Sequence, residues 1–305
     1  MKRLFLFLVT NIVAVMTLTF VAAVVCALCG VDIASASGGE DILPLLIFSF
    51  VFGMAGSIIS LMLSKTIVKA SMKCRTIDGS EGEAERWLVD TVADLARRAN
   101  VKMPEVAIYP GEANAFATGA RKNAALVAVS TRIMEQMSRE ELRAVLGHEM
   151  THVSNGDMVT MCLTQGIINT FVIFFSHILA SVVQGAMSSR DGNRGRRRGG
   201  TGGYMMYHMF VKLFQVVFGL FAAMVVMWYS RRREFAADAG SARLLGSPGP
   251  MIAALRRLGN LKPGVLPDSL KAFGVSGGIA SLFASHPPLE DRVNALMNLP
   301  PSYAV

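Results

Sequence analysis

Long uncharged runs dominate the pattern of hydrophobic and polar positions along the chain. Residues 4–31 and 42–64 contain no Lys, Arg, Asp or Glu, and neither do residues 158–189 and the shorter run 213–230. A helix needs about 20 apolar residues to cross about 30 Å of hydrocarbon, so the pattern predicts four hydrophobic segments. The first is expected to be an anchor rather than a cleaved signal peptide, because it is longer than the roughly 7–15 apolar residues of a signal sequence.

Basic residues mark the ends of these segments. They precede the first segment, follow the second from Lys65 and follow the fourth from Arg231. Because loops rich in Lys and Arg stay in the cytoplasm, we expect both termini and residues 65–157 and 231–305 to lie there. The Arg-rich loop at 190–198 breaks this rule if the third and fourth segments both cross the bilayer. Either the loop is an exception or this hairpin crosses incompletely, and the sequence leaves both open.

The polar blocks predict a mixed α+β domain that the third and fourth segments interrupt. Apolar residues recur at helical spacing within 79–101. Short β-branched runs broken by Gly, Pro and Asn in 104–130 predict two or three strands. We therefore expect an α-helical membrane protein with a mixed α+β domain. Its expected parts are two N-terminal spans in 1–65, the first part of the domain in 66–157, a membrane hairpin in 158–230 and the second part of the domain in 231–305.

A helix that begins after a capping box of Ser138 and Glu141 carries the sequence HEMTH at 148–152. Glu149 continues the apolar stripe of this helix, with the two histidines along its edge. These side chains therefore face the interior, where unpaired polar groups cost free energy that a metal ion and its water would offset. A solvated helix that contains two histidines by chance is the alternative. The apolar stripe consists of Leu142, Val145, Leu146 and Val153.

The spacing of the histidines fits a zinc site. Residues four apart lie on one face of a helix, and catalytic zinc takes three protein ligands and one water. Glu149 is placed to act as general base on that water. The third ligand is expected on another helix, where Glu234 and Asp238 are again four apart. They form either a surface pair bonded to neighbouring arginines, or a zinc ligand and a carboxylate that accepts a hydrogen bond from a ligand imidazole.

Further sequences accompany these motifs, namely NAFATG at 114–119, REFAADAGSARL around the two acidic residues and SHPPLEDRV near the end. With the hydrophobic segments, this combination resembles the HtpX-type membrane zinc metalloproteases, which are bacterial relatives of the CAAX prenyl proteases. The resemblance implies that His148, His152 and Glu234 bind one Zn²⁺ and that Glu149 is the catalytic base. It also implies a gluzincin-like domain that faces the cytoplasm, in a multi-pass protein of the bacterial inner membrane that degrades misfolded or damaged membrane proteins.

Two other segments are candidates for the site. By resemblance, NAFATG lies on an edge strand beside the cleft, where Asn114, Ala115 and Phe116 would bind an extended substrate. An ordinary strand turn is the alternative. His286 stands before two prolines. It either donates to the oxyanion that forms during peptide hydrolysis or only fixes a turn before the last helix, and Arg292 is a weaker candidate.

Other classes of function stay open. An intramembrane protease of the site-2 type would place the motif inside a hydrophobic span, whereas this helix has four charged residues between 139 and 143. A non-proteolytic zinc hydrolase and a membrane scaffold or sensor with a structural zinc are the further alternatives. Structural zinc sites normally have four protein ligands. No Cys lies near the motif, although His286 could serve as a fourth ligand.

The charge and layout of the chain indicate its partners. The net charge is +8 and the isoelectric point is about 9.6. The basic residues lie mostly beside hydrophobic segments, so anionic lipid is a simpler partner than nucleic acid. His152 lies a few residues before the third segment, and Glu234 lies a few residues after the fourth. We therefore expect the site within one or two helical turns of the bilayer surface, where it meets membrane-protein substrates. The oligomeric state is not predicted.

Overall fold

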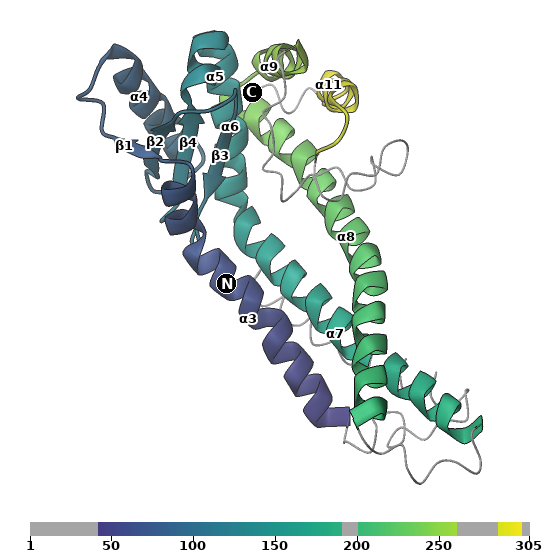
Figure 1. Ribbon diagram of the computed structural model, residues 1–305. Coiled ribbons are helices and arrows are strands. Elements are labelled where there is room, and N and C mark those ends of the chain that lie inside the picture. The colour runs from purple at the N-terminus through teal and green to yellow at the C-terminus, as the bar shows by residue number, and fades with distance from the viewer. Residues whose placement is uncertain (1–41, 191–200, 261–285, 301–305) are drawn as a thin grey trace. The chain divides into compact units, whose positions relative to one another are not determined.

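The computed structural model of the chain describes residues 42–190, 201–260 and 286–300 (Figure 1). The first hydrophobic run and most of the Arg-rich loop lie outside the described residues. The helices are α3 (Ile42–Ser71), α4 (Glu83–Arg98), α5 (Thr131–Gln136), α6 (Arg139–Asn155), α7 (Asp157–Arg190), α8 (Thr201–Leu245), α9 (Gly249–Asn260) and α11 (Leu289–Met297). The strands are β1 (Arg75–Ile77), β2 (Glu105–Tyr109), β3 (Ala115–Thr118) and β4 (Leu126–Ser130).

Three long helices carry the second, third and fourth hydrophobic runs. Within the described residues, α3, α7 and α8 are the helices long and apolar enough to cross a membrane. At 1.5 Å per residue, even the 30 residues of α3 extend about 45 Å, which exceeds the hydrocarbon thickness. Helix α8 continues without a break from its apolar run into the sequence REFAAD. The fold class is therefore confirmed as an α-helical, multi-pass membrane protein with a small mixed sheet.

The described residues divide into two compact units, the first of which consists of apolar helix segments. It contains α3 up to Ser57, α7 from Leu163 and α8 up to Ala223. Small residues bring α3 and α7 into contact, because a side chain on Gly53 would collide with the backbone of Thr170. Close approach through small residues is typical of helix packing in membranes.

The second unit contains the sheet and the remaining helices, with the ends of α3, α7 and α8 that adjoin them. The strand order is β1-β2-β4-β3, in which β2 and β4 are parallel and the two outer pairs are antiparallel. The prediction of two or three strands in 104–130 is borne out by β2, β3 and β4, whereas β1 was not predicted. Strand β3 lies at an edge of the sheet (Figure 1).

Successive side chains of β2 and β4 point alternately into two apolar clusters. Val106, Ile108, Val127 and Val129 belong to the main core with α4, α6 and α9. Ala107, Tyr109, Leu126 and Ala128 belong to a second cluster with Met72, Cys74 and Phe116. The predicted amphipathic helix is α4, whose Leu88, Val92 and Leu95 are fully buried. Because successive strand side chains point to opposite faces, the sheet is covered on both sides.

Both ends of α6 are fixed by local sequence. The Ser138 hydroxyl accepts from the Glu141 N–H, and the Glu141 carboxylate accepts from the Ser138 N–H, which is the predicted capping box. At the other end, Gly156 adopts a left-handed conformation with φ of 70°, and its N–H caps the helix. The chain turns there and begins α7 at once, so the motif helix and α7, which carries the third hydrophobic segment, are joined by a single residue.

Candidate metal centre

Helices α6 and α8 approach each other closely beside the HEMTH motif. A Cβ on Gly147 would lie 2.8 Å from Ser241 Oγ, and a Cβ on Gly240 would overlap the side chain of Thr151. Ser241 also donates a hydrogen bond of 2.7 Å to the carbonyl of Ala144. Glycine at these crossing points lets the helix backbones come together. The contact places Glu234, six residues before Gly240 on α8, against the histidines of α6.

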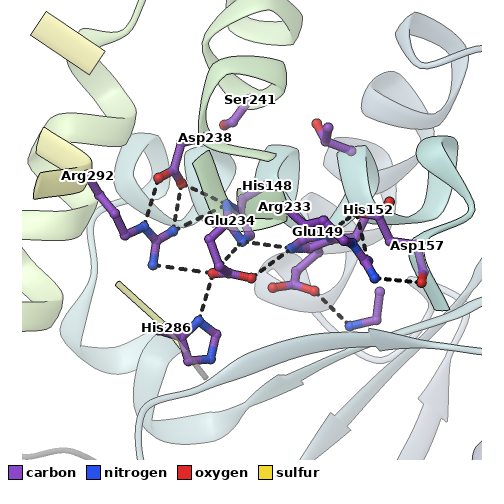
Figure 2. Close-up of polar contacts among 12 residues, drawn as sticks. His148, Glu149, His152, Asp157, Arg233, Glu234, Asp238, Ser241, His286 and Arg292 are labelled. Carbon is purple, nitrogen blue, oxygen red and sulfur yellow. Dashed lines mark hydrogen bonds and ion pairs between the residues drawn. The ribbon is translucent and has the colours of Figure 1, made fainter. Parts of the chain in front are cut away.

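Three possible ligand atoms converge at this crossing (Figure 2). The Nε2 atoms of His148 and His152 are 3.1 Å apart, and the Glu234 carboxylate oxygens lie 3.5 Å from the first and 3.3 Å from the second. In a tetrahedral zinc site with bonds of about 2.0–2.1 Å, ligand atoms lie about 3.3–3.4 Å apart. The three observed distances lie on either side of this value, so the donor set and its spacing fit a divalent metal ion.

Each imidazole is oriented by a carboxylate behind it. Nδ1 of His148 is 2.8 Å from Asp238 Oδ1, and Nδ1 of His152 is 2.6 Å from Asp157 Oδ2. When Nδ1 donates its proton to a carboxylate, Nε2 carries the lone pair that a metal needs. Burial opposes the charged form of His148, but hydrogen bonds to Asp238 and Glu234 outweigh it and raise the pKa of the ring. The surroundings of His148 therefore favour positive charge.

Each orienting carboxylate is paired in turn with an arginine. Arg292 Nε and Nη2 donate to the two oxygens of Asp238 at 2.7 and 2.6 Å, an arrangement that Figure 2 shows at the left of the site. Burial opposes the charge of Arg292, but these bonds to Asp238 raise the pKa of the guanidinium. Arg233 Nη2 lies 2.9 Å from Asp157 Oδ2, and its Nη1 donates to the Asp157 carbonyl at 2.8 Å. Both imidazoles are thus supported by buried ion pairs.

Glu149 faces the same centre from the motif helix. One oxygen of its carboxylate accepts a hydrogen bond of 2.8 Å from the backbone N–H of Ala117 on β3. Removal from water raises the pKa of Glu149, because it disfavours the charged form, and the neighbouring histidines oppose this shift only in part. The bond to Ala117 fixes the carboxylate beside the three ligand atoms and leaves its second oxygen available to accept a proton.

The strand beside Glu149 has an open edge. At the start of β3, the carbonyl of Asn114 accepts a hydrogen bond from the N–H of Ser130 on β4. Backbone N–H and C=O groups alternate in direction along an antiparallel strand, so those of Ala115 and Ala117 point away from β4. Asn114 and Ala115 line a cavity at the centre. The ring of Phe116 instead packs on Tyr109 in the second apolar cluster, with centroids 5.5 Å apart. Of the three predicted substrate-binding residues, the structure thus brings two to the cavity.

Two cavities flank the centre, and both are lined by Glu149 and Glu234. The first, which we name the α9 cavity, has a volume of about 280 Å³ and includes His148. The second, the α7 cavity, has a volume of about 270 Å³ and includes His152. The remaining lining of the α9 cavity is mostly apolar and comes from β3, α5, α6, α9 and α11, together with Asn114 and His286. The remaining lining of the α7 cavity comes from β3, α7 and α8.

His286 also reaches the centre, although from the exposed side. Its Nδ1 is 2.7 Å from Glu234 Oε2, while 65% of its side chain is exposed. Arg292 Nη1 is 3.5 Å from the same oxygen. His286 and Arg292 therefore both lie against the carboxylate of Glu234 (Figure 2). Two residues that sequence reasoning missed, Asp157 and Arg233, also belong to this network. Their one signal was their position near hydrophobic runs: Asp157 directly precedes the third, and Arg233 lies three residues after the fourth.

Comparisons with known proteins agree with this geometry. The family model "Peptidase family M48" matches residues 83–299. The "Protease HtpX homolog" of Janthinobacterium sp. (strain Marseille) is 50% identical over 98% of this chain and 100% of its own length, and that of Herminiimonas arsenicoxydans is 49% identical over the same shares. The crystal structure of S. mikatae Ste24p shares the fold, with a TM-score of 0.58 at 18% identity, over 95% of this chain and 66% of that one. The chain therefore belongs to peptidase family M48 and is an HtpX-type, membrane-bound metalloprotease.

Proposed function

We propose that the chain is a zinc-dependent endopeptidase of the bacterial inner membrane that cleaves misfolded or damaged membrane proteins. The observation that carries the proposal is the convergence of His148, His152 and Glu234 beside Glu149 and an open strand edge. In the proposed site, these three residues hold one zinc ion per chain, and Asp238 fixes the ring of His148. Zinc supplies Lewis acidity that lowers the pKa of a bound water and polarises a substrate carbonyl.

Glu149 is the proposed general base. The N–H of Ala117 holds one of its carboxylate oxygens at 2.8 Å, so the other oxygen takes a proton from the attacking water and returns it to the leaving amine. The raised pKa of Glu149 helps the first transfer, because a stronger base takes up the proton of the water more readily. Glu149 thereby acts in both halves of peptide hydrolysis.

The open edge of β3 is the proposed substrate platform. Ala115 presents its backbone N–H and C=O at that edge, and an extended peptide pairs with such groups as an added strand. Asn114 lines the α9 cavity at the start of the strand and is proposed to help bind the substrate there. Phe116 supports the platform from behind through its contact with Tyr109 rather than by touching the substrate.

His286 and Arg292 have different proposed roles. His286 is exposed, and its proposed role is to leave Glu234 and donate to the oxygen that becomes negative as the carbonyl is attacked. Arg292 is nearly buried, with 7% of its side chain exposed, and holds Asp238 through two hydrogen bonds. We therefore propose that His286 acts on the substrate and that Arg292 acts on the orientation of His148.

The location of the centre supports membrane-protein substrates. Asp157 and Met158 begin α7 directly after the motif helix, and Glu234 lies four residues beyond Ser230, where the uncharged run of α8 ends. The positive residues that follow the second and fourth segments support a catalytic domain in the cytoplasm, by the positive-inside rule, and contact with anionic lipid.

A membrane scaffold or sensor with a structural zinc is the second candidate function. The position of His286, 2.7 Å from Glu234, favours it, because His286 is close enough to become a fourth protein ligand. Metal-edge absorption spectroscopy of the purified, zinc-loaded chain tests the difference. Three protein ligands plus one water, together with peptide cleavage by the same sample, support the endopeptidase. Four protein ligands that remain when an unfolded substrate is added, without cleavage, support the structural site.

A further inference from the structure

The two cavities beside the metal centre differ in the part of the chain that lines them. Both include Glu149 and Glu234, so they lie on two sides of the same reacting position. The α9 cavity is lined further by Ile133, Met251 and Leu258. The α7 cavity is lined further by Met158, Met161 and Ser230, which stand at the ends of the two uncharged runs that form the membrane hairpin.

The edge strand β3 sets the direction in which a bound substrate crosses the two cavities. Ala115 lines the α9 cavity and Ala117 lines the α7 cavity, so β3 runs from the first cavity to the second. Antiparallel strand pairs are slightly more stable than parallel pairs and two to three times as common. A substrate strand that pairs antiparallel with β3 therefore runs from Ala117 towards Ala115. Its residues before the scissile bond lie at the α7 cavity, and its residues after that bond lie at the α9 cavity.

The α7 cavity is also the short route from the membrane to the centre. Met158 is the first residue of one uncharged run, and Ser230 is the last residue of the other. Glu234 lies four residues beyond Ser230 on the same helix, which is about 6 Å along the axis. Two residues of extended chain cover about 7 Å. None of the described residues that line the α9 cavity belongs to either run.

From this geometry we propose that the enzyme cuts membrane-anchored substrates on the C-terminal side of their anchor. The inference rests on the proposed endopeptidase function and adds the class of substrate. The membrane span precedes the scissile bond, a short polar linker crosses the α7 cavity, and the polar segment that follows lies along the α9 cavity. Water hydrolyses the amide, so the anchored fragment keeps a new carboxylate and the released fragment gains a new amine. The flexible side chains of Met158 and Met161 adapt to varied residues between the span and the scissile bond.

Two matched substrates test the proposal in proteoliposomes that contain the full chain and zinc. The span-first substrate carries one membrane helix before a cleavable reporter segment, and the span-last substrate carries the same helix after it. Both place the reporter on the side of the catalytic domain, and each is made with linkers of about 5, about 10 and about 20 residues. The same reporter without a span is the third substrate, and mass spectrometry maps the bond that is cut. The Glu149→Gln variant controls for contaminating proteases.

The expected result is a difference that depends on linker length. With the shortest linker, the span-first substrate is cut at least about tenfold faster than the span-last substrate, because only the former reaches the centre with its strand antiparallel to β3. With about 20 residues the linker can turn, and the two rates converge. Equal rates at the shortest linker, or faster cleavage of the span-last substrate, overturn the proposal. Failure of the wild type to cut the unanchored reporter instead contradicts the endopeptidase function itself.

Discussion

The carboxylate of Asp157 offers a sharp test of how the metal centre is held. Asp157→Asn keeps the size of the side chain and an oxygen that can accept from His152. The change removes the negative charge that faces Arg233 at 2.9 Å. Both side chains are largely removed from solvent, with 11% of Asp157 and 14% of Arg233 exposed. The substitution therefore isolates the charge of the carboxylate from its shape.

Two effects of Asp157→Asn can be given a magnitude. Loss of a carboxylate that supports a ligand histidine costs about 10–100-fold in metal affinity, which is about 1.4–2.7 kcal/mol. Loss of one partner of a buried ion pair costs about 3–5 kcal/mol in folding. Because asparagine keeps hydrogen-bonding atoms near Arg233, we expect the lower end of that range. Metal binding and the free energy of unfolding should therefore both fall.

The matched control for this variant is Asp94→Asn. Asp94 also forms ion pairs, with Arg97, Arg98 and Arg143, but 30% of its side chain is exposed and it lies on α4. An exposed pair contributes about 0–1 kcal/mol, so this variant should keep the metal affinity of the wild type. Competition with a chromophoric chelator gives the affinity, and denaturant titration gives the stability. Unchanged metal affinity in Asp157→Asn, or an equal loss in Asp94→Asn, would refute the reasoning.

Three further variants probe other contacts of the site. Arg292→Lys keeps the charge but not the two-point contact with the carboxylate of Asp238. It should lower the free energy of unfolding, measured by denaturant titration, by about 1.5–3 kcal/mol. An unchanged midpoint would count against the role given to this pair. Ala117→Pro removes the N–H that holds the carboxylate of Glu149, at an open strand edge where proline is tolerated. Cleavage should fall about 10–100-fold while metal content stays constant. Loss of the metal would show that the strand had moved. Gly240→Ala should destabilise the chain by about 1–3 kcal/mol, because the helices α6 and α8 must separate. Gly219→Ala should not, because a Cβ at that position meets no atom within 4 Å. Equal shifts in thermal unfolding would contradict the close crossing.

The parts of the site that follow helical spacing were predictable from the sequence. His148, Glu149 and His152 share a helix whose limits are fixed by Ser138 and Gly156, so their common face depends only on local structure. Glu234 was found through its own spacing and the resemblance to a family. The structure adds that its helix crosses α6 at two glycines, which no local pattern reveals.

Other parts depend on tertiary structure and could not be predicted. Strand β1 has three residues and no alternation, and it exists because it pairs with β2. Asp157 reaches His152 because the chain turns at Gly156 with φ of 70°, and Arg233 meets Asp157 because α7 and α8 lie together at this point. The direction of substrate binding likewise follows from which end of β3 adjoins which cavity.

The central claim is that Glu149 acts as the base at a metal held by His148, His152 and Glu234. The most direct test is cleavage of an unfolded polypeptide by the purified, detergent-solubilised chain, with zinc measured on the same sample, for the wild type and Glu149→Gln side by side. We expect equal zinc in both, close to one ion per chain, and a loss of cleavage of about 10²–10⁴-fold in the variant. Cleavage by Glu149→Gln at the rate of the wild type, with zinc still bound, would contradict it.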